Sequence, residues 1–247
     1  FDVAIARHMF AHNDDPADLL AAMSLILSDD GIFLIENAYA LDTFQNGEFD
    51  QIYHEHMFYF SALNISALMQ KFDFELLDFF HSPVHGGSGI FICGKKGRHT
   101  PNASVQDTLD KERIAFKDNK IFHDFKLKIE SNKIKAMELI HEEKRQGQVV
   151  GAYGAPAKAF TVFSYYELDD SSVAFCIDTT PTKIGKVFPK FNIPILSEEA
   201  LNELEYNTVL INAWNYKEDI LKKASLIFKK GTKLIFLIPD LKIHIVK

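Results

Sequence analysis

Apolar positions along the chain recur in two arrangements, which predict alternating strands and helices. The apolar run at 1–6 predicts a strand. The continuous apolar run at 31–38 predicts a buried strand, because a strand that is covered on both faces needs no polar alternation. Between these runs, apolar residues recur at helical spacing after Asp15 and Pro16. Asp as N-cap and Pro as first helical residue are a typical helix start, so we expect a strand–helix–strand unit here.

The next stretch continues this unit. Segment 39–60 is aromatic and contains glycine, and we expect a loop with a short helix at most. Residues 64–72 predict a helix. Runs at 75–81 and 89–95 predict strands, and their short connection favours antiparallel pairing.

A polar segment with Pro and Gly, residues 97–106, interrupts the pattern. We interpret it as a hinge, and we expect two domains, residues 1–98 and 99–247. Residues 107–146 predict a long charged helical stretch, whose runs of charge we interpret as a solvated face.

Strand and helix patterns alternate again in the second half. The pattern begins with a strand at 149–150, a glycine turn and a helix start at Pro156. Further strands are expected at 173–177, 208–213 and 233–238, and helices at 197–204 and 217–229. This alternation predicts a Rossmann-like parallel sheet, so the fold class is α/β throughout.

Composition narrows the function classes. The net charge of −7 argues against a general polyanion binder, and we expect neither nucleic acid nor membrane as a partner. Cys93 and Cys176 lie far apart in apolar runs and are typical of buried thiols in a reducing compartment. No apolar run has the length of a membrane span and no signal peptide is visible, so we expect a cytoplasmic protein.

Tyr53, His54, Glu55 and His56 place four proton-transfer side chains in consecutive positions between aromatic residues. His-x-His can be half of a metal site, but no Cys or further His lies close by, and we expect no metal. A buried hydrogen-bonded network is a second interpretation. Proton transfer is the interpretation we favour, because it needs a base together with a partner that orients it.

The turn Gly151-x-x-Gly154 before a helix is a second candidate site. Free N–H groups and the helix dipole favour an anion there, and Lys158 adds a positive charge. A plain packing turn between strand and helix explains the glycines equally well. In parallel sheets ligands bind at the carboxyl ends of strands, where Gly154, Asp178 and Trp214-Asn215 are all expected.

Several motifs together carry a family resemblance. They are Arg7-His8 with His12, Asp50-Gln-Ile-Tyr-His-Glu-His56, His85-Gly-Gly-Ser88, Gly151-Ala-Tyr-Gly-Ala-Pro-Ala-Lys158 and Asp178-Thr-Thr-Pro-Thr-Lys183. In this order they resemble the S-adenosylmethionine-dependent C-methyltransferases that act on nucleotide-linked keto sugars. The resemblance implies a partial class I methyltransferase sheet, which is Rossmann-like, followed by a second Rossmann-like domain.

The resemblance also has gaps. The family's zinc-binding module and the first half of its methyltransferase domain, with the glycine-rich cofactor loop, have no counterpart here. Residues 1–6 resemble the fourth strand of that domain. We therefore expect this chain to be the C-terminal portion of a longer protein.

The resemblance implies roles for single residues. His56 is the general base, and Tyr53 and Glu55 orient it or bond the sugar. His12 donates to the enolate oxygen or positions the substrate, although a capping or packing role is an equal alternative. S-adenosyl-L-methionine lies against three residues, mainly their backbone: Ala6, Arg7 and His8.

The substrate implied is a nucleotide-diphosphate keto sugar. Its expected contacts lie in both domains: His85, Gly87, Ser88, Tyr153, Gly154, Lys158, Asp178 and Lys186. The His85-Gly-Gly-Ser88 segment has an alternative as a strand-entry turn.

Two other function classes stay open. The first is a truncated, non-catalytic protein that binds a nucleotide sugar. The second is a nicotinamide-dependent oxidoreductase, but Gly151-x-x-Gly154 is not Gly-x-Gly-x-x-Gly, and Asp178 at the next strand end is its only support.

Overall fold

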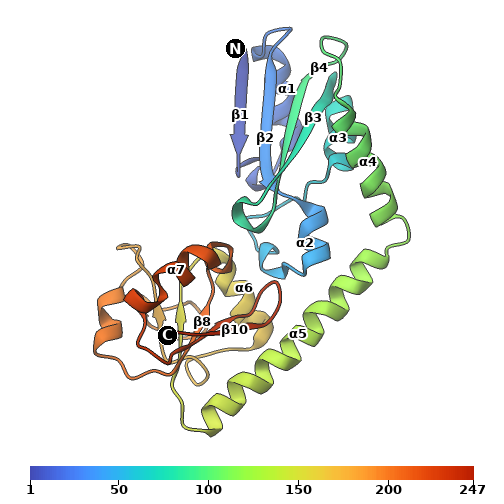
Figure 1. The fold of residues 1–247 in the computed structure, drawn as a ribbon. Coiled ribbons are helices and arrows are strands. Elements are labelled where there is room, and N and C mark those ends of the chain that lie inside the picture. Colours follow the sequence, from blue (N-terminus) through green and yellow to red (C-terminus); the bar gives the residue numbers. More distant parts are fainter. The chain divides into compact units, whose positions relative to one another are not determined.

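A computed structural model describes residues 1–247, which form two compact units. The first unit comprises residues 1–45 and 54–125, and the second comprises 46–53 and 126–247. The short segment 46–53 thus belongs to the second unit, although the chain on both sides of it belongs to the first. Each unit has its own sheet, as Figure 1 shows.

The first unit contains a four-stranded sheet in the order β1-β2-β4-β3. Its strands are β1 (Val3–Arg7), β2 (Ile32–Ala38), β3 (Phe74–Ser82) and β4 (Ser88–Lys95). β1 and β2 are parallel, whereas β4 runs antiparallel to both β2 and β3. These strands confirm the expected elements in type and in antiparallel pairing. The α/β fold class with Rossmann-like sheets is likewise confirmed.

Local capping sets the helix starts of this unit. α1 (Pro16–Ile26) begins where expected, and the Asp15 side chain accepts a hydrogen bond from the Asp18 N–H. α3 (Ala62–Gln70) begins before the expected residue 64. The reason is a capping box, in which Ser61 and Asn64 bond each other's backbone N–H.

Segment 39–60 contains α2 (Ala40–Asn46) and the single 3₁₀ turn Phe49–Gln51. The expected loop with one short helix at most is present, and the 3₁₀ turn is an addition to it. Phe60 at its end forms an isolated bridge with Tyr39, and both rings are buried.

The first unit extends beyond the expected boundary at residues 98/99. α4 (Ala103–Phe116) packs on α3 and β3. Its Glu112 is fully buried and accepts hydrogen bonds from the Tyr39 hydroxyl and from the N–H groups of Ala62 and Leu63. The predicted division therefore differs from the compact units, because a buried carboxylate fastens α4 to the start of α3.

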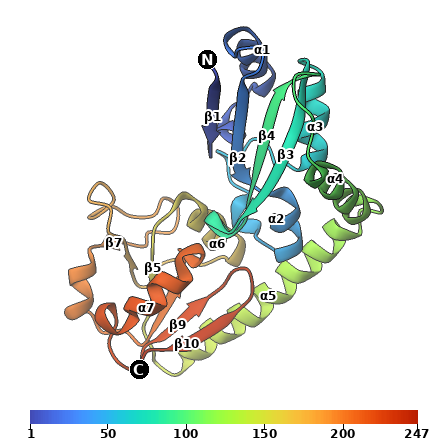
Figure 2. The same cartoon turned by 45° about the horizontal axis from the view of Figure 1, so that its top comes forward.

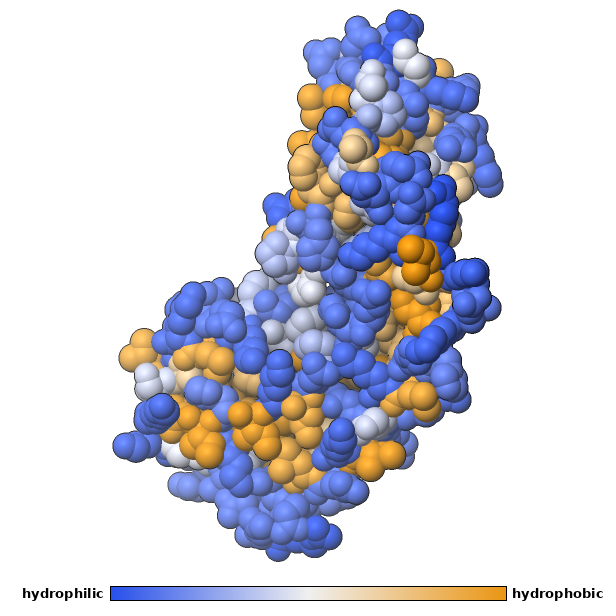
Figure 3. Space-filling view, turned by 45° about the vertical axis from the view of Figure 1, so that its right-hand side comes forward, coloured by the Kyte–Doolittle hydropathy of each residue, from blue (hydrophilic) through white to orange (hydrophobic).

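The expected long helical stretch is two helices, α4 and α5 (Lys120–Arg145). Exposed pairs such as Lys120–Asp124 and Lys126–Glu130 fit a solvated face. Figure 3 shows orange patches among the blue hydrophilic surface. The two helices contribute to the exposed apolar surface through Ile114 (78% exposed) and Ile134 (60%).

The second unit contains a six-stranded sheet in the order β10-β9-β8-β5-β6-β7. Its strands are β5 (Val150–Tyr153), β6 (Cys176–Ile177), β7 (Ile195–Leu196), β8 (Thr208–Ile211), β9 (Lys233–Phe236) and β10 (Lys242–Ile245). All pairs are parallel except β9 and β10, which lie side by side as antiparallel neighbours (Figure 2). The expected parallel sheet is present, and β7 and β10 are additions to it.

The helices of this unit include α6 (Ala157–Tyr166) and α7 (Lys217–Ile227). The helix expected at 197–204 is a 3₁₀ segment, Glu198–Asn202. The strand expected at 173–177 is ordered as a strand only at its last two residues. Both differences shorten an expected element without changing the order of elements.

Candidate active site

A buried carboxylate organises the carboxyl ends of β1 and β2. Glu36 is 6% exposed, and its carboxylate lies 2.6 Å from Arg7 Nε and 3.5 Å from His8 Nε2. Sequence reasoning did not single out Glu36, although a Glu-Asn pair at the end of an apolar strand was a visible signal. Since this polar pair ends a buried strand, it places charge at the sheet edge where ligands bind.

His8 has an unusual backbone and a perturbed side chain. Its φ is 48°, in the left-handed region that non-glycine residues rarely adopt. Burial and the neighbouring His85 lower the pKa of the His8 imidazole, with Arg7 adding to this and Glu36 opposing it. His8 and His85 rings meet edge to face with centroids 4.5 Å apart. His8 is therefore favoured as a neutral imidazole.

A second histidine pair lies in the same unit. The rings of His12 and His56 meet edge to face with centroids 5.0 Å apart. Glu55 Oε2 is 3.8 Å from His12 Nδ1, and Glu55 Oε1 is 3.8 Å from His54 Nε2. The side chains of His12 and Glu55 are 33% and 50% exposed, so both are open to a ligand. The fold thus brings His12 to the Tyr-His-Glu-His motif, while His54 is 84% exposed.

The His85-Gly-Gly-Ser88 turn leads into β4. Ser88 is fully buried and donates to the Val84 carbonyl, while the Gly87 carbonyl accepts from the Tyr39 N–H. Gly87 has φ 149°, and a Cβ there would lie 2.3 Å from Oδ2 of Asp42. The backbone conformation favours glycine, and an added Cβ would also require the Asp42 carboxylate to move.

In the second unit, the glycine turn after β5 is closed by internal bonds. A Cβ on Gly151 would lie 2.4 Å from the Phe175 ring, and Gly154 has φ 90°. The Gly154 carbonyl accepts from Asn212 Nδ2 at 2.8 Å. Gly151 therefore makes room for a packed ring, and Gly154 makes the turn.

Asp178 holds this turn in place. Its carboxylate accepts from the Ala155 N–H at 2.7 Å and from the Thr180 N–H at 2.8 Å, and Lys183 Nζ is 3.6 Å away. Burial alone would raise the pKa of Asp178, but the bonds from Thr180 and Ala155, together with Lys183, outweigh it and hold the pKa low. Asp178 is thus ionised and largely occupied by backbone donors.

The three other predicted residues on the second unit differ in their exposure and in their partners. Tyr153 donates its hydroxyl to Glu198 at 2.8 Å, and burial followed by this carboxylate raises the pKa of the phenol. Lys186 is exposed on the loop after Asp178. Lys158 is instead largely buried, 3.4 Å from the Asp50 carboxylate. Glu198 and Asp50 are partners that sequence reasoning did not assign.

Comparison with known proteins identifies the family of the chain. Residues 83–239 match the family described as the C-methyltransferase C-terminal domain, and residues 1–78 match a methyltransferase domain family. The chain belongs to the C-methyltransferase family. It is 30% identical over 236 residues to the C-methyltransferase NovU of Streptomyces niveus. The aligned region covers 95% of this chain and 56% of the relative. The chain thus spans about half the length of this curated relative.

The contacts of Asp178 argue against the nicotinamide-dependent alternative. A nicotinamide-binding site would need an acidic side chain free to bond a ribose, whereas both Asp178 oxygens accept backbone hydrogen bonds. No group of three or more His, Cys, Asp or Glu side chains has a metal-site arrangement, and no helix is long and apolar enough to cross a membrane. Cys93 and Cys176 are buried free thiols, as expected.

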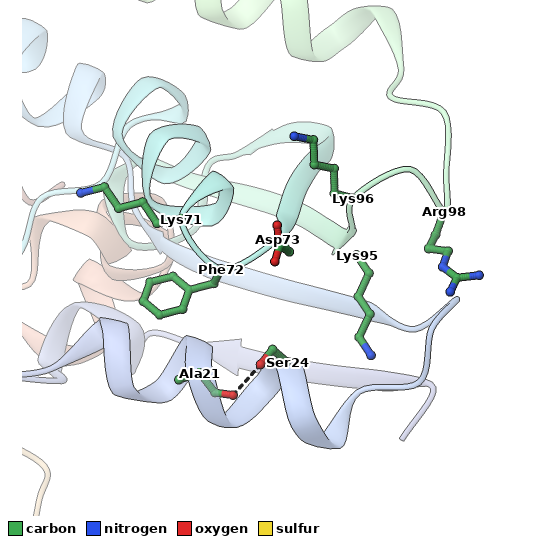
Figure 4. Close-up of a pocket in the computed structure, with 8 residues that line it drawn as sticks. All are labelled: Ala21, Ser24, Lys71, Phe72, Asp73, Lys95, Lys96 and Arg98. Atoms are coloured by element: carbon green, nitrogen blue, oxygen red, sulfur yellow. Dashed lines mark hydrogen bonds between the residues drawn. The ribbon is translucent and has the colours of Figure 1, made fainter.

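The chain also has a basic pocket in its first unit, with a volume of about 550 Å³. Its cationic lining residues are Lys71, Lys95, Lys96 and Arg98. In Figure 4 their charged ends point in different directions, and two of them pair with Asp29. The pocket lies where β4 ends beside the start of β2, away from the histidine pairs. The cations do not converge on one point, so the pocket lacks the geometry of an anion site.

Proposed function

We propose that the protein transfers a methyl group from S-adenosylmethionine to a carbon next to the ketone of a nucleotide-linked sugar. The observation that carries this proposal is the pair of imidazoles, His12 and His56, with Glu55 beside His12. A carbon next to a ketone becomes nucleophilic when a base removes its proton and a donor stabilises the enolate oxygen. Two adjacent imidazoles supply both functions.

In this mechanism His56 is the base. One of its ring nitrogens takes the proton as the C–H bond breaks, and the electron pair moves onto the ketone oxygen. His12 donates a hydrogen bond to that oxygen, and Glu55 Oε2, 3.8 Å from His12 Nδ1, orients the ring. Tyr53 bonds the sugar. The enolate carbon then forms its new bond to the methyl carbon as the methyl–sulfur bond breaks, and the electron pair of that bond stays on the sulfur.

S-adenosylmethionine supplies, when bound, a methyl group on a positively charged sulfur. Ala6, Arg7 and His8 at the carboxyl end of β1 are proposed to lie against it. Glu36 engages the Arg7 guanidinium, which favours contact through the backbone. His8 Nε2 is buried and lies 3.5 Å from Glu36 Oε1, so its polar contact within the protein is a long one. These features fit a polar ligand at this strand end.

The sugar nucleotide is proposed to use residues of both units. In the first unit these are His85, Gly87 and Ser88. In the second they lie at the carboxyl edge of the sheet: Tyr153, Gly154, Lys158, Asp178 and Lys186. The exposed Lys186 suits a diphosphate, because its positive charge can bind a phosphate without breaking a buried ion pair such as that of Lys158.

Exchange of the substrate's proton with D₂O tests this proposal without methyl transfer. In the full-length protein, His56→Asn should abolish exchange at the ketone-adjacent carbon and lower turnover by about 10²–10⁴-fold. Binding of S-adenosylmethionine should stay near the wild-type value. His123→Asn, an exposed histidine on α5, is the matched control and should behave as wild type.

Two results would contradict the proposal. Undiminished exchange in His56→Asn would remove this residue from the role of base. Binding of a nucleoside diphosphate by wild-type protein, without methyl-donor binding or turnover, would instead support the non-catalytic sugar-nucleotide-binding alternative.

A further inference from the structure

Asp50 is a charged residue in an unusual position. It is 0% exposed, and it lies in segment 46–53, which belongs to the second unit while its flanks belong to the first. The chain therefore enters the second unit, returns at residues 53/54, and only then reaches His56. Asp50 opens the Asp-Gln-Ile-Tyr-His-Glu-His motif, but the mechanism above gives it no role.

Two residues of the second unit hold the Asp50 carboxylate. Trp214 Nε1 donates to its Oδ2 at 2.6 Å, and Lys158 Nζ lies 3.4 Å from the same oxygen. The Lys158 ammonium also sits 4.7 Å from the centre of a Trp214 ring. The three side chains form one cluster, in which a cation and an indole N–H neutralise and bond a buried carboxylate.

Neighbouring residues fix the rest of the segment. The Phe49 ring packs on Tyr165 and Tyr166 of α6, with centroids 4.9 and 5.7 Å away. The Thr161 hydroxyl donates to the Ile52 carbonyl at 3.2 Å. The segment is thus tied to α6 on both sides of Asp50, and Tyr53 follows Ile52 directly.

We propose that Asp50 is a positioning residue, which with Trp214 and Lys158 fixes the start of the loop that presents Tyr53 and His56. This inference rests on the proposed function, and Asp50 acts through the peptide chain without touching the substrate. A buried carboxylate without its partners would draw in water or move out, because an unpaired buried charge is strongly unfavourable. The cluster therefore fixes the backbone that leads, through Ile52 and Tyr53, directly to His56.

Lys158 is proposed both to pair with Asp50 and to bind substrate. Because its ammonium is paired with a buried carboxylate, binding of a phosphate by Lys158 would compete with that pair. Positioning and phosphate binding predict different behaviour when both charges are removed together. Loss of Lys158 alone leaves Asp50 uncompensated, whereas loss of both charges leaves no buried ion.

The test uses the full-length protein with three variants: Asp50→Asn, Lys158→Met and the Asp50→Asn/Lys158→Met double variant. Asp50→Asn keeps the size and one acceptor oxygen but loses the charge. We expect its kcat and its D₂O exchange to fall by about 10²-fold, the scale of a misplaced catalytic group, with KM for the methyl donor unchanged. Lys158→Met should be the least stable variant, and the double variant should regain stability and return to the kcat of Asp50→Asn.

Thr208→Val is the matched control, because it removes a buried hydrogen bond to Glu143 elsewhere in the second unit. It should lower the unfolding midpoint without lowering kcat. Trp214 is the sole tryptophan of these 247 residues, and its emission should shift in Asp50→Asn and stay unchanged in Thr208→Val.

The outcomes separate this inference from the proposed function. If His56→Asn stops exchange but Asp50→Asn keeps full kcat, or loses no more than Thr208→Val, the positioning role is overturned and the base assignment survives. If the double variant binds nucleoside diphosphate far more weakly than Asp50→Asn and does not regain stability, Lys158 is a phosphate ligand and the positioning cluster is overturned.

Discussion

The imidazole rings of His12 and His56 lie edge to face, with their centroids 5.0 Å apart. His12 belongs to a 3₁₀ turn after β1, and His56 belongs to the loop before α3. The turn is held by the buried Asn37 of β2, whose side-chain oxygen accepts from the Ala11 N–H. The pair therefore depends on the strand ends that position the turn, and each ring can take a separate part in proton transfer.

Substitutions of His12 and of its neighbour Glu55 should lower turnover to different extents. His12→Asn should lower turnover by about 10²–10³-fold, the usual effect of losing a donor to a developing oxyanion. Glu55→Gln keeps the shape but loses the charge, so its effect should be smaller. Steady-state kinetics in the full-length protein measures both. The exposed His54→Asn is the control within the same loop, and a loss as large as that of His12→Asn would point to loop disruption.

The Gly87 position should tolerate no side chain. Gly87→Ala places a Cβ 2.3 Å from Oδ2 of Asp42, a carboxylate that pairs with His81 at 2.5 Å. We expect loss of activity together with a lower thermal midpoint. Gly97→Ala is the matched control, because Gly97 also has positive φ but nothing within 4 Å of its added Cβ. It should cost only the strain of a left-handed backbone, about 1–2 kcal/mol.

Glu112 should be a main determinant of the stability of the first unit. Glu112→Ala leaves the Tyr39 hydroxyl and the N–H groups of Ala62 and Leu63 without their acceptor. Unsatisfied buried groups cost about 1–3 kcal/mol each, so the free energy of unfolding should fall by at least ~3 kcal/mol.

Tyr39→Phe is the comparison for Glu112, because it removes one of the same bonds and keeps the ring packing. It should lower the free energy of unfolding by about 1 kcal/mol. Denaturant titration of both variants checks this order, and equal losses would show that the backbone bonds to Glu112 contribute little.

Much of the fold was readable from the sequence because its signals are local. The apolar runs of β1 and β2, and the Asp15-Pro16 helix start, depend on residues that are neighbours in the chain. β7 is a two-residue strand, which is too short to show any periodicity. Its place is set by pairing with β6, and no local pattern encodes that.

The site was readable only in part, for the same reason. The residue types of the Tyr-His-Glu-His motif suggested proton transfer, but the sequence contains no signal that Asp50 and Glu112 are buried. Each looks like a surface charge in sequence, and each is buried because partners far along the chain, Trp214 and Tyr39, meet it in the fold. Long-range pairing of this kind leaves no spacing signal.

Asp178 should make the stability of the second unit sensitive to acid. Its folded-state pKa lies below the ordinary carboxyl value of about 3.9, since donated hydrogen bonds and Lys183 outweigh burial. A lowered pKa contributes stability that is present above the unfolded value and is lost as pH falls through the folded value. Asp178→Asn should therefore be less stable at neutral pH, and its unfolding midpoint should fall less than that of wild type below about pH 4. Thermal unfolding between pH 7 and pH 3 measures the difference, with the exposed Asp170→Asn as the control that keeps the wild-type profile. Parallel profiles for Asp178→Asn and wild type would mean that these hydrogen bonds do not depend on the charge of Asp178.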